Sequence, residues 1–261
     1  MSFKTDTSFL RFLSMGALGV QQTMKQLRAL GFEPIELDRG CTSNKIWMTK
    51  VKRLRLPDLL CVRTGLRVEV RAKSDLKIRM SDAPNDTDRR WDAGLRHNDV
   101  AAFIAIWEQD GRQRAADAAM FFTIKTLRKS VNQSKLGPPK SASEGAERDR
   151  TWPAIIPSRS GTVRSVTTEK LVVEMGGDGN PIRSQTYSLR GKRAYVRPGE
   201  TFKAEVSILA GAPARLANLT PFLDLKYDPA VDLRARKAMD RYAAVKALPN
   251  RGSARESCSV A

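Results

Sequence analysis

The sequence contains a single histidine, His97, among 261 residues. This scarcity argues against metal sites built from several histidines and against the hydrolases that depend on them. Cysteine is also rare, because Cys41, Cys61 and Cys258 are the only three and show no CxxC spacing. We therefore expect neither a disulfide framework nor a cysteine zinc site. Any hydrolytic chemistry has to use carboxylates, lysine and a metal ion.

Long apolar runs are also missing. No stretch approaches the roughly 18 apolar residues of a membrane-spanning helix. The first 13 residues mix Lys4, Asp6 and Arg11 with apolar residues and lack the apolar core of a signal peptide. Together with the few cysteines, this predicts a cytoplasmic protein of a prokaryote or a phage, without a membrane as partner.

Acidic residues are too few to balance the basic ones. The chain has 46 lysines and arginines against 28 aspartates and glutamates, a formal net charge of +18. A surplus of this size favours an anionic partner, and nucleic acid is the class we expect. Hydrophobic residues make up 41% of the chain, which is enough for a proper core. A homodimer or a larger complex is compatible with this composition.

The pattern along the chain predicts an α/β domain followed by smaller parts. An apolar stripe from Leu13 to Leu30 predicts a first helix, and several strands follow it. We expect this domain to have a mixed sheet with flanking helices. The predicted parts are the α/β domain at 1–135, a linker at 136–152, a small all-β barrel at 153–211 and a helical tail at 212–261.

The chemistry-bearing residues gather on a predicted hairpin. Pro57-Asp58 precedes a short apolar strand, Thr64-Gly65 marks a turn, and Arg67–Lys73 alternates between apolar and charged residues. A two-residue turn pairs Leu59 with Val70 and Asp58 with Arg71. Asp58 then shares one face with Glu69, Arg71 and Lys73, and the apolar residues face the core.

Two carboxylates beside a lysine are typical of metal-assisted hydrolysis. Mg²⁺ binds one or two carboxylates together with water and phosphate oxygens, and Mn²⁺ is the alternative ion. We expect Asp58 and Glu69 to bind the ion, which activates a water molecule for attack. Lys73 would orient this water, and Arg71 would contact phosphate. The simpler alternative is a half-buried strand with a solvated charged face.

The run Pro57-Asp58, a short hairpin, and Glu69-Val70-Arg71-Ala72-Lys73 resembles the PD-(D/E)xK nuclease superfamily. This resemblance implies a restriction-endonuclease-like or resolvase-like core, with a helix before the strands. It also implies that Asp58 and Glu69 bind the metal and that Lys73 is the catalytic lysine. The implied function is a metal-dependent DNA endonuclease.

One position departs from the pattern of this superfamily. The second acid should stand two residues before the lysine, where this chain has Arg71. Either Glu69 replaces that acid, or Arg71 pairs with Asp58 and the chain is an inactive nuclease fold that binds DNA or serves as an assembly subunit. On the first helix, where the superfamily often has another acid, this chain offers Gln21. An RNA-processing enzyme is a third alternative.

Other features add weaker expectations. Six cations form candidate phosphate contacts, namely Lys50, Lys52, Arg53, Arg55, Arg89 and Arg90. Trp47 and Trp91 suit either base stacking or core packing, of which we expect core packing. The predicted β-barrel resembles a barrel-sandwich hybrid domain in Gly161-Thr162-Val163 and in the run from Val196 to Ala204. It lacks an evident turn for a modified lysine, so no lipoyl or biotin role is expected.

Overall fold

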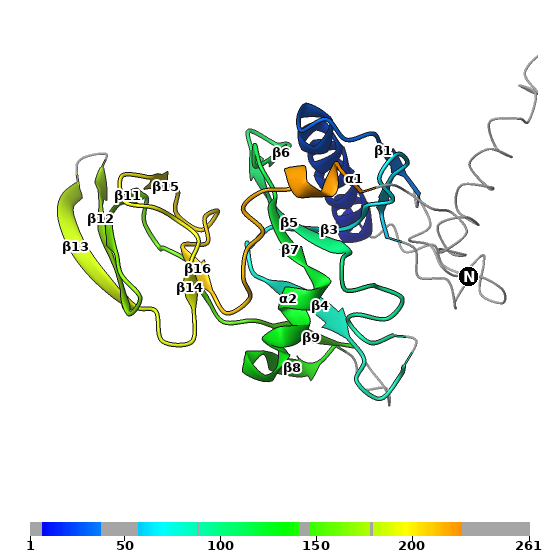
Figure 1. The fold of residues 1–261 in the computed structure, drawn as a ribbon. Coiled ribbons are helices and arrows are strands. Elements are labelled where there is room, and N and C mark those ends of the chain that lie inside the picture. The colour runs from blue at the N-terminus through cyan, green and yellow to red at the C-terminus, as the bar shows by residue number, and fades with distance from the viewer. Residues whose placement is uncertain (1–6, 38–56, 88, 141–146, 178–179, 226–261) are drawn as a thin grey trace, which may run out of the picture.

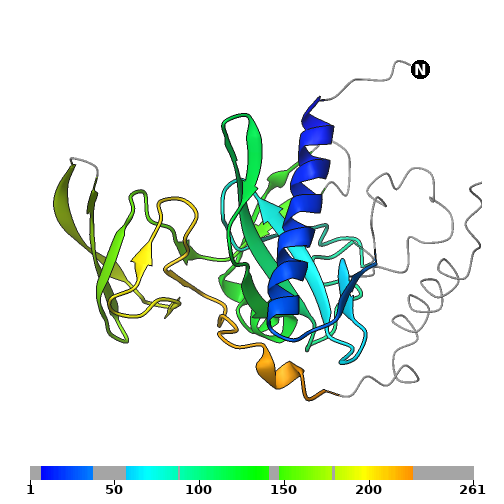
Figure 2. The same ribbon diagram turned by 90° about the horizontal axis from the view of Figure 1, so that it is seen from above.

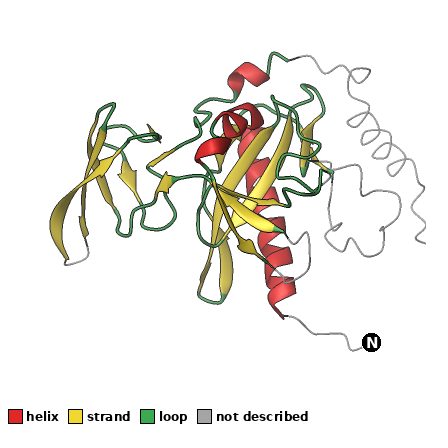
Figure 3. Cartoon of the chain, turned by 90° about the horizontal axis from the view of Figure 1, so that it is seen from below, coloured by secondary structure: helices red, strands yellow, loops and turns green. Residues whose placement is uncertain are grey.

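The fold is that of a mostly β protein with one main helix (Figure 3). The computed structural model describes residues 7–37, 57–87, 89–140, 147–177 and 180–225. Within these ranges, only α1 (Thr7–Ala29) is a helix of seven residues or more. The expectation of an α/β domain with several flanking helices is therefore wrong in part: a mixed sheet is present, and one long helix covers it.

The main sheet contains antiparallel and parallel pairs. Its order is β1-β2-β3-β5-β6, with β7 also paired to β5. The first three strands form antiparallel pairs, whereas β3 and β5 run parallel. The chain crosses over between these two strands, as parallel pairing requires. The strands are β1 (Pro34–Glu36), β2 (Leu59–Cys61), β3 (Arg67–Lys73), β5 (Val100–Gln109), β6 (Arg112–Ala115) and β7 (Met120–Thr123).

Helix α1 covers one face of this sheet (Figure 2). The predicted apolar stripe forms the contact, because Val20 and Leu27 are buried against the apolar residues of β3 and β5. A Cβ on Gly19 would lie 2.7 Å from the Cβ of Ala72 on β3, so glycine lets helix and strand approach closely here. The charged residues of β3 consequently face away from α1.

The opposite face of the sheet carries a second core. Phe103 and Phe122 pack edge-to-face there, and Trp91 packs in the same way on Trp152. The expectation that Trp91 is a core residue is confirmed. Short elements surround this core: β4 (Arg79–Asp82), α2 (Ile124–Lys129), the 3-10 helix η1 (Val131–Gln133), β8 (Lys135–Pro139) and β9 (Arg148–Thr151).

The segment expected to be a linker belongs to this core. Strands β8 and β9 pair with each other, and β9 pairs with β4, so that Ser81 lies opposite Asp149. Trp152 follows β9 and is only 1% exposed. Most of β8 and all of β9 thus lie within the range 136–152 that was expected to be a linker. Its many charges are explained by ion pairs across a small sheet rather than by a solvated chain.

An ion pair inside the protein fixes the start of β3. Arg67 is 1% exposed and Asp99 is 4% exposed. The Nε of Arg67 donates to Asp99 Oδ1 at 2.8 Å, and its Nη2 donates to Asp99 and to the carbonyl oxygen of Gly94. The backbone N–H of Arg96 donates to the same carboxylate at 2.6 Å. The alternating pattern predicted the correct face for Arg67, but it did not predict that Arg67 is buried.

Residues 154–177 and 180–211 form an all-β unit beside the main body (Figure 1). Ile155, Val163, Leu171, Val173 and Phe202 contribute to its separate core. It consists of two open antiparallel sheets, β10-β16-β14 and β13-β12-β11-β15, rather than one closed barrel. The strands are β10 (Ala154–Ile155), β11 (Gly161–Val166), β12 (Lys170–Gly177), β13 (Asn180–Ser188), β14 (Arg193–Ala194), β15 (Thr201–Phe202) and β16 (Ala210–Gly211).

After β16 the chain returns to the main body. Leu216 forms a β-bridge with Phe121, and Leu219 is buried in the core beneath α1. The 3-10 helix η2 (Thr220–Phe222) is the last described element, and residues 226–261 of the predicted helical tail at 212–261 lie outside the described part. Among the described helices, none is both long and apolar enough to cross a bilayer.

Candidate active site

After Arg67, the charged face of β3 continues with a buried acid, Glu69. Glu69 is only 5% exposed, and its Oε1 lies 2.5 Å from Nη2 of Arg71, the next residue on the same face. The arginine thus neutralises the carboxylate on its own strand. The Nε of Arg71 and that of Arg79 are buried and have no acceptor among the described residues. Buried donors without acceptors are rare in native proteins and are costly, so they call for a functional or structural reason.

Asp58 lies beside this acid. It immediately precedes β2, and its Oδ2 accepts a hydrogen bond of 2.6 Å from the backbone N–H of Val70 on β3. Its carbonyl oxygen accepts from the N–H of Leu37 at 2.9 Å. The carboxylate is therefore fixed at the β3 backbone, next to Glu69, by the hairpin itself.

The register of this hairpin differs from the prediction by two residues. Cys61 N–H donates to the carbonyl oxygen of Leu66 at 2.8 Å, which leaves a four-residue turn at 62–65 in place of a two-residue turn. Leu59 consequently pairs with Val68 and not with Val70. A shift of two keeps every side chain on its expected face. Continued by one residue, this register places Asp58 opposite Glu69 rather than opposite Arg71.

The corrected register changes the neighbours of Lys73. Compared with the predicted register, Asp58 lies two residues, or about 7 Å along the strand, further from Lys73. Lys73 ends β3 and is half-buried close to the small sheet of β4, β9 and β8. Burial lowers the pKa of Lys73 to about 8, and the charges of Arg71 and Arg79 act in the same direction. The carboxylate of Asp149 opposes this effect.

Asp149 is a site residue that sequence reasoning did not identify. It lies on β9, with its Oδ1 2.9 Å from Nζ of Lys140 and its Oδ2 3.3 Å from Nη1 of Arg79. Burial alone would raise the pKa of Asp149, but the hydrogen bond and charge of Lys140, together with Arg79, lower it. The available signal was the alternation of charges just before the buried Trp152, which is typical of a strand.

The remaining predicted site residues are dispersed. Gln21 is exposed on α1, which covers the opposite face of the sheet from Glu69. Arg89 forms an ion pair of 3.2 Å with Glu147, and Nε of Arg90 lies 3.9 Å from Asp92. The other four predicted phosphate contacts lie outside the described residues, namely Lys50, Lys52, Arg53 and Arg55.

The lowered pKa of Lys73 predicts a stability effect. Since the folded state disfavours its ammonium form, Lys73 destabilises the protein at pH values below about 8, and this penalty disappears as the pH rises toward 10.5. We expect Lys73→Met to raise the free energy of unfolding by about 1 to 2 kcal/mol at pH 7. Urea denaturation of both proteins at several pH values measures this difference. An advantage of the variant that stays constant up to pH 10.5 would contradict the explanation.

No family model, no curated protein and no solved structure matches this chain. The chemistry of the site is therefore the basis for assigning a function. That chemistry consists of two neighbouring carboxylates, Asp58 and Glu69, an arginine, and a lysine whose pKa is shifted toward neutrality.

Proposed function

We propose that this chain is a metal-dependent nuclease that hydrolyses phosphodiester bonds of DNA. The observation that carries this proposal is Lys73, which lies on the same face of β3 as Glu69 and Arg71 and has a pKa lowered to about 8. Lysines with such pKa values are suited to proton transfer near neutral pH. The order of elements agrees with the resemblance to the PD-(D/E)xK superfamily, since a helix precedes the strands and Asp58 lies directly before β2.

The donor set suits a hard divalent cation. Asp58 and Glu69 supply carboxylate oxygens from neighbouring strands, and Mg²⁺ or Mn²⁺ binds such oxygens together with water. A divalent ion bound there would lower the pKa of an attacking water and polarise the phosphate.

Three side chains of the protein then have separate roles. Asp58 is held by the β3 backbone, so its carboxylate keeps one orientation. Arg71 brings positive charge next to Glu69 and binds a phosphate oxygen of the substrate. Lys73 in its neutral form accepts a proton from the attacking water, and its lowered pKa provides enough of this form near pH 8.

The second candidate function is a nuclease fold without activity that binds DNA or assembles with other chains. The Glu69–Arg71 ion pair of 2.5 Å favours it, because the arginine supplies a positive charge where a cation would otherwise be needed. In the structure Arg71 forms an ion pair with Glu69, whereas the inactive alternative had expected Arg71 to pair with Asp58. Both candidates require DNA binding, and only the first requires cleavage.

Cleavage of supercoiled plasmid DNA with Mg²⁺ or Mn²⁺ tests this proposal. We expect Asp58→Asn, which keeps an acceptor for Val70 N–H, and Lys73→Met to lower the rate by roughly 100-fold. Lys77→Met is the matched control, because Lys77 is an exposed lysine that follows β3 and pairs with Asp75. Lys73→Met is also expected to be the more stable protein at pH 7, so its inactivity could not result from unfolding.

Equal cleavage by the wild type and all three variants would contradict the assigned site. If the wild type binds DNA and does not cleave plasmid, branched DNA or RNA with either metal ion, the chain is the non-catalytic binding subunit. Cleavage of RNA alone would assign the same residues to an RNA-processing enzyme.

A further inference from the structure

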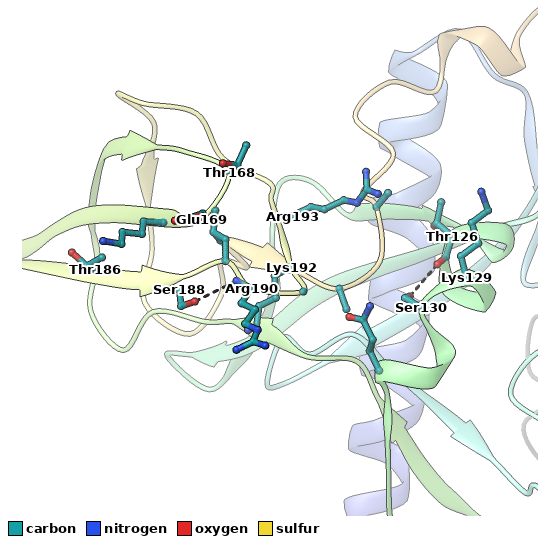
Figure 4. Close-up of a pocket in the computed structure, with 16 residues that line it drawn as sticks. Thr126, Lys129, Ser130, Thr168, Glu169, Thr186, Ser188, Arg190, Lys192 and Arg193 are labelled. Carbon is teal, nitrogen blue, oxygen red and sulfur yellow. Dashed lines mark hydrogen bonds between the residues drawn. The ribbon is translucent and has the colours of Figure 1, made fainter.

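A large pocket lies between the main body and the all-β unit (Figure 4). It has a volume of about 940 Å³, and none of Asp58, Glu69, Arg71 and Lys73 lines it. Helices α2 and η1 of the main body form one wall. The turn between β11 and β12, the end of β13 and the turn that leads to β14 form the other wall.

The lining of this pocket is strongly basic. Its charged residues are five cations and one acid, namely Lys129, Lys170, Arg190, Lys192, Arg193 and Glu169. In the part of the chain that the structure describes, none of the five cations forms an ion pair. Some other described surface cations do have a carboxylate partner, as Arg89 and Arg164 do. The lining therefore carries a net positive charge that suits an anionic ligand.

The uncharged lining points to phosphate oxygens as the ligand atoms. Thr126, Thr168, Thr186 and Ser188 bring hydroxyl groups to the pocket, and hydroxyl groups are common donors to nucleic-acid phosphates. The lining includes no aromatic side chain. Sites for single strands use aromatic residues to stack the bases, so this lining suits a backbone whose bases remain paired.

We propose that this pocket binds the phosphodiester backbone of duplex DNA, as a second contact apart from the hairpin site. Lys129 approaches the strand from α2, while Arg190 and Arg193 approach it from the all-β unit. A bound backbone therefore bridges the two parts of the chain and fixes how the duplex lies on the protein. This contact does not recognise a base sequence. Its ligand is nucleic acid, as in the proposed function, but binding here does not depend on hydrolysis.

The test compares two triple variants that remove equal charge. The pocket variant is Lys129→Gln, Arg190→Gln and Arg193→Gln, all at exposed residues of the lining. The control variant is Lys203→Gln, Arg183→Gln and Arg197→Gln, whose residues are also exposed on the all-β unit but do not line the pocket. Binding of a labelled DNA duplex is measured at several salt concentrations in the presence of a metal chelator, so that no cleavage occurs.

We expect the pocket variant to bind the duplex about 10- to 100-fold more weakly at low salt. The slope of log affinity against log salt should also become shallower by about 2 to 3, because each phosphate contact on duplex DNA contributes about 0.9. The control variant should retain the wild-type slope. Equal slopes for the two variants would overturn the proposal, and so would equal binding of polyglutamate or full competition by inorganic phosphate.

The outcomes also separate this proposal from the proposed nuclease. Lys77→Met should bind the duplex like the wild type, since Lys77 belongs neither to the hairpin site nor to the lining of the pocket. A wild type that does not cleave, with a pocket variant that binds weakly, rejects the nuclease and supports the pocket. A wild type that cleaves, with a pocket variant that binds normally, rejects the pocket alone.

Discussion

Asp99→Asn is expected to lower the free energy of unfolding by about 3 to 5 kcal/mol. The substitution removes the negative charge that balances Arg67, whose side chain is only 1% exposed. It also weakens the acceptor for the backbone N–H of Arg96. An isolated buried charge is among the most destabilising features of a protein interior. Urea or thermal denaturation at neutral pH measures the loss.

The double variant Arg67→Met with Asp99→Asn separates the ion pair from the surrounding packing. Methionine fills a similar volume without charge, so the double variant should be more stable than Asp99→Asn alone. Glu147→Gln is the comparison for an exposed pair, because Glu147 and Arg89 are 40% and 50% exposed in their side chains. We expect it to change stability by less than about 1 kcal/mol. A loss below about 1 kcal/mol for Asp99→Asn would show that Arg67 gains water or another partner.

Trp152→Ala is expected to cost about 3 to 5 kcal/mol, the usual range for removing a buried aromatic side chain. The indole is 1% exposed, packs edge-on against Trp91 at 5.1 Å, and donates from Nε1 to the carbonyl oxygen of Leu127 at 3.2 Å. The variant leaves a cavity and an unsatisfied acceptor within the core next to β9. Trp152→Phe should cost less, since the ring remains and only the hydrogen bond is lost.

Trp107→Ala provides a control for this result. Trp107 lies on β5 and is only half-buried, so its removal should cost clearly less than the removal of Trp152. Similar losses for Trp152→Ala and Trp107→Ala would contradict the assignment of residues 148–152 to the core. Denaturation followed by far-UV circular dichroism avoids the change in tryptophan fluorescence.

Local patterns predicted much of the fold. The apolar stripe gave α1, and the alternation in Arg67–Lys73 gave both β3 and the face of each of its residues. These elements follow from periodicity, which acts over a few residues and does not depend on partners distant in the sequence.

The details that failed depend on such distant partners. Thr64-Gly65 marks the turn, but the pairing of Cys61 with Leu66 is set by how β2 packs, so the register could not be read from the turn residues. Arg67 looks like a solvent-facing cation until Asp99, 32 residues later, is placed beside it. The charges of β9 resemble those of a linker because their partners on β4 precede them by about 70 residues.

For the candidate site, the sequence predicted the side chains of the hairpin and not their surroundings. Asp58 and Glu69 do lie on neighbouring strands, and Lys73 follows on the same face. The pairing of Glu69 with Arg71 required the observed geometry, because alternation places them on one face without specifying a contact. Asp149, which shifts the electrostatic surroundings of Lys73, comes from a strand that the sequence did not suggest.

The pairing of β4 with β9 has a consequence for synthesis on the ribosome. Ser81 pairs with Asp149, 68 residues later, and at roughly 5 to 20 residues per second this partner follows after about 3 to 14 s. Leu219, which is buried beneath α1, follows later still. The nascent chain therefore exposes an unfinished sheet during this time, and the hairpin that carries Lys73 gains its complete surroundings only after the all-β unit has been made.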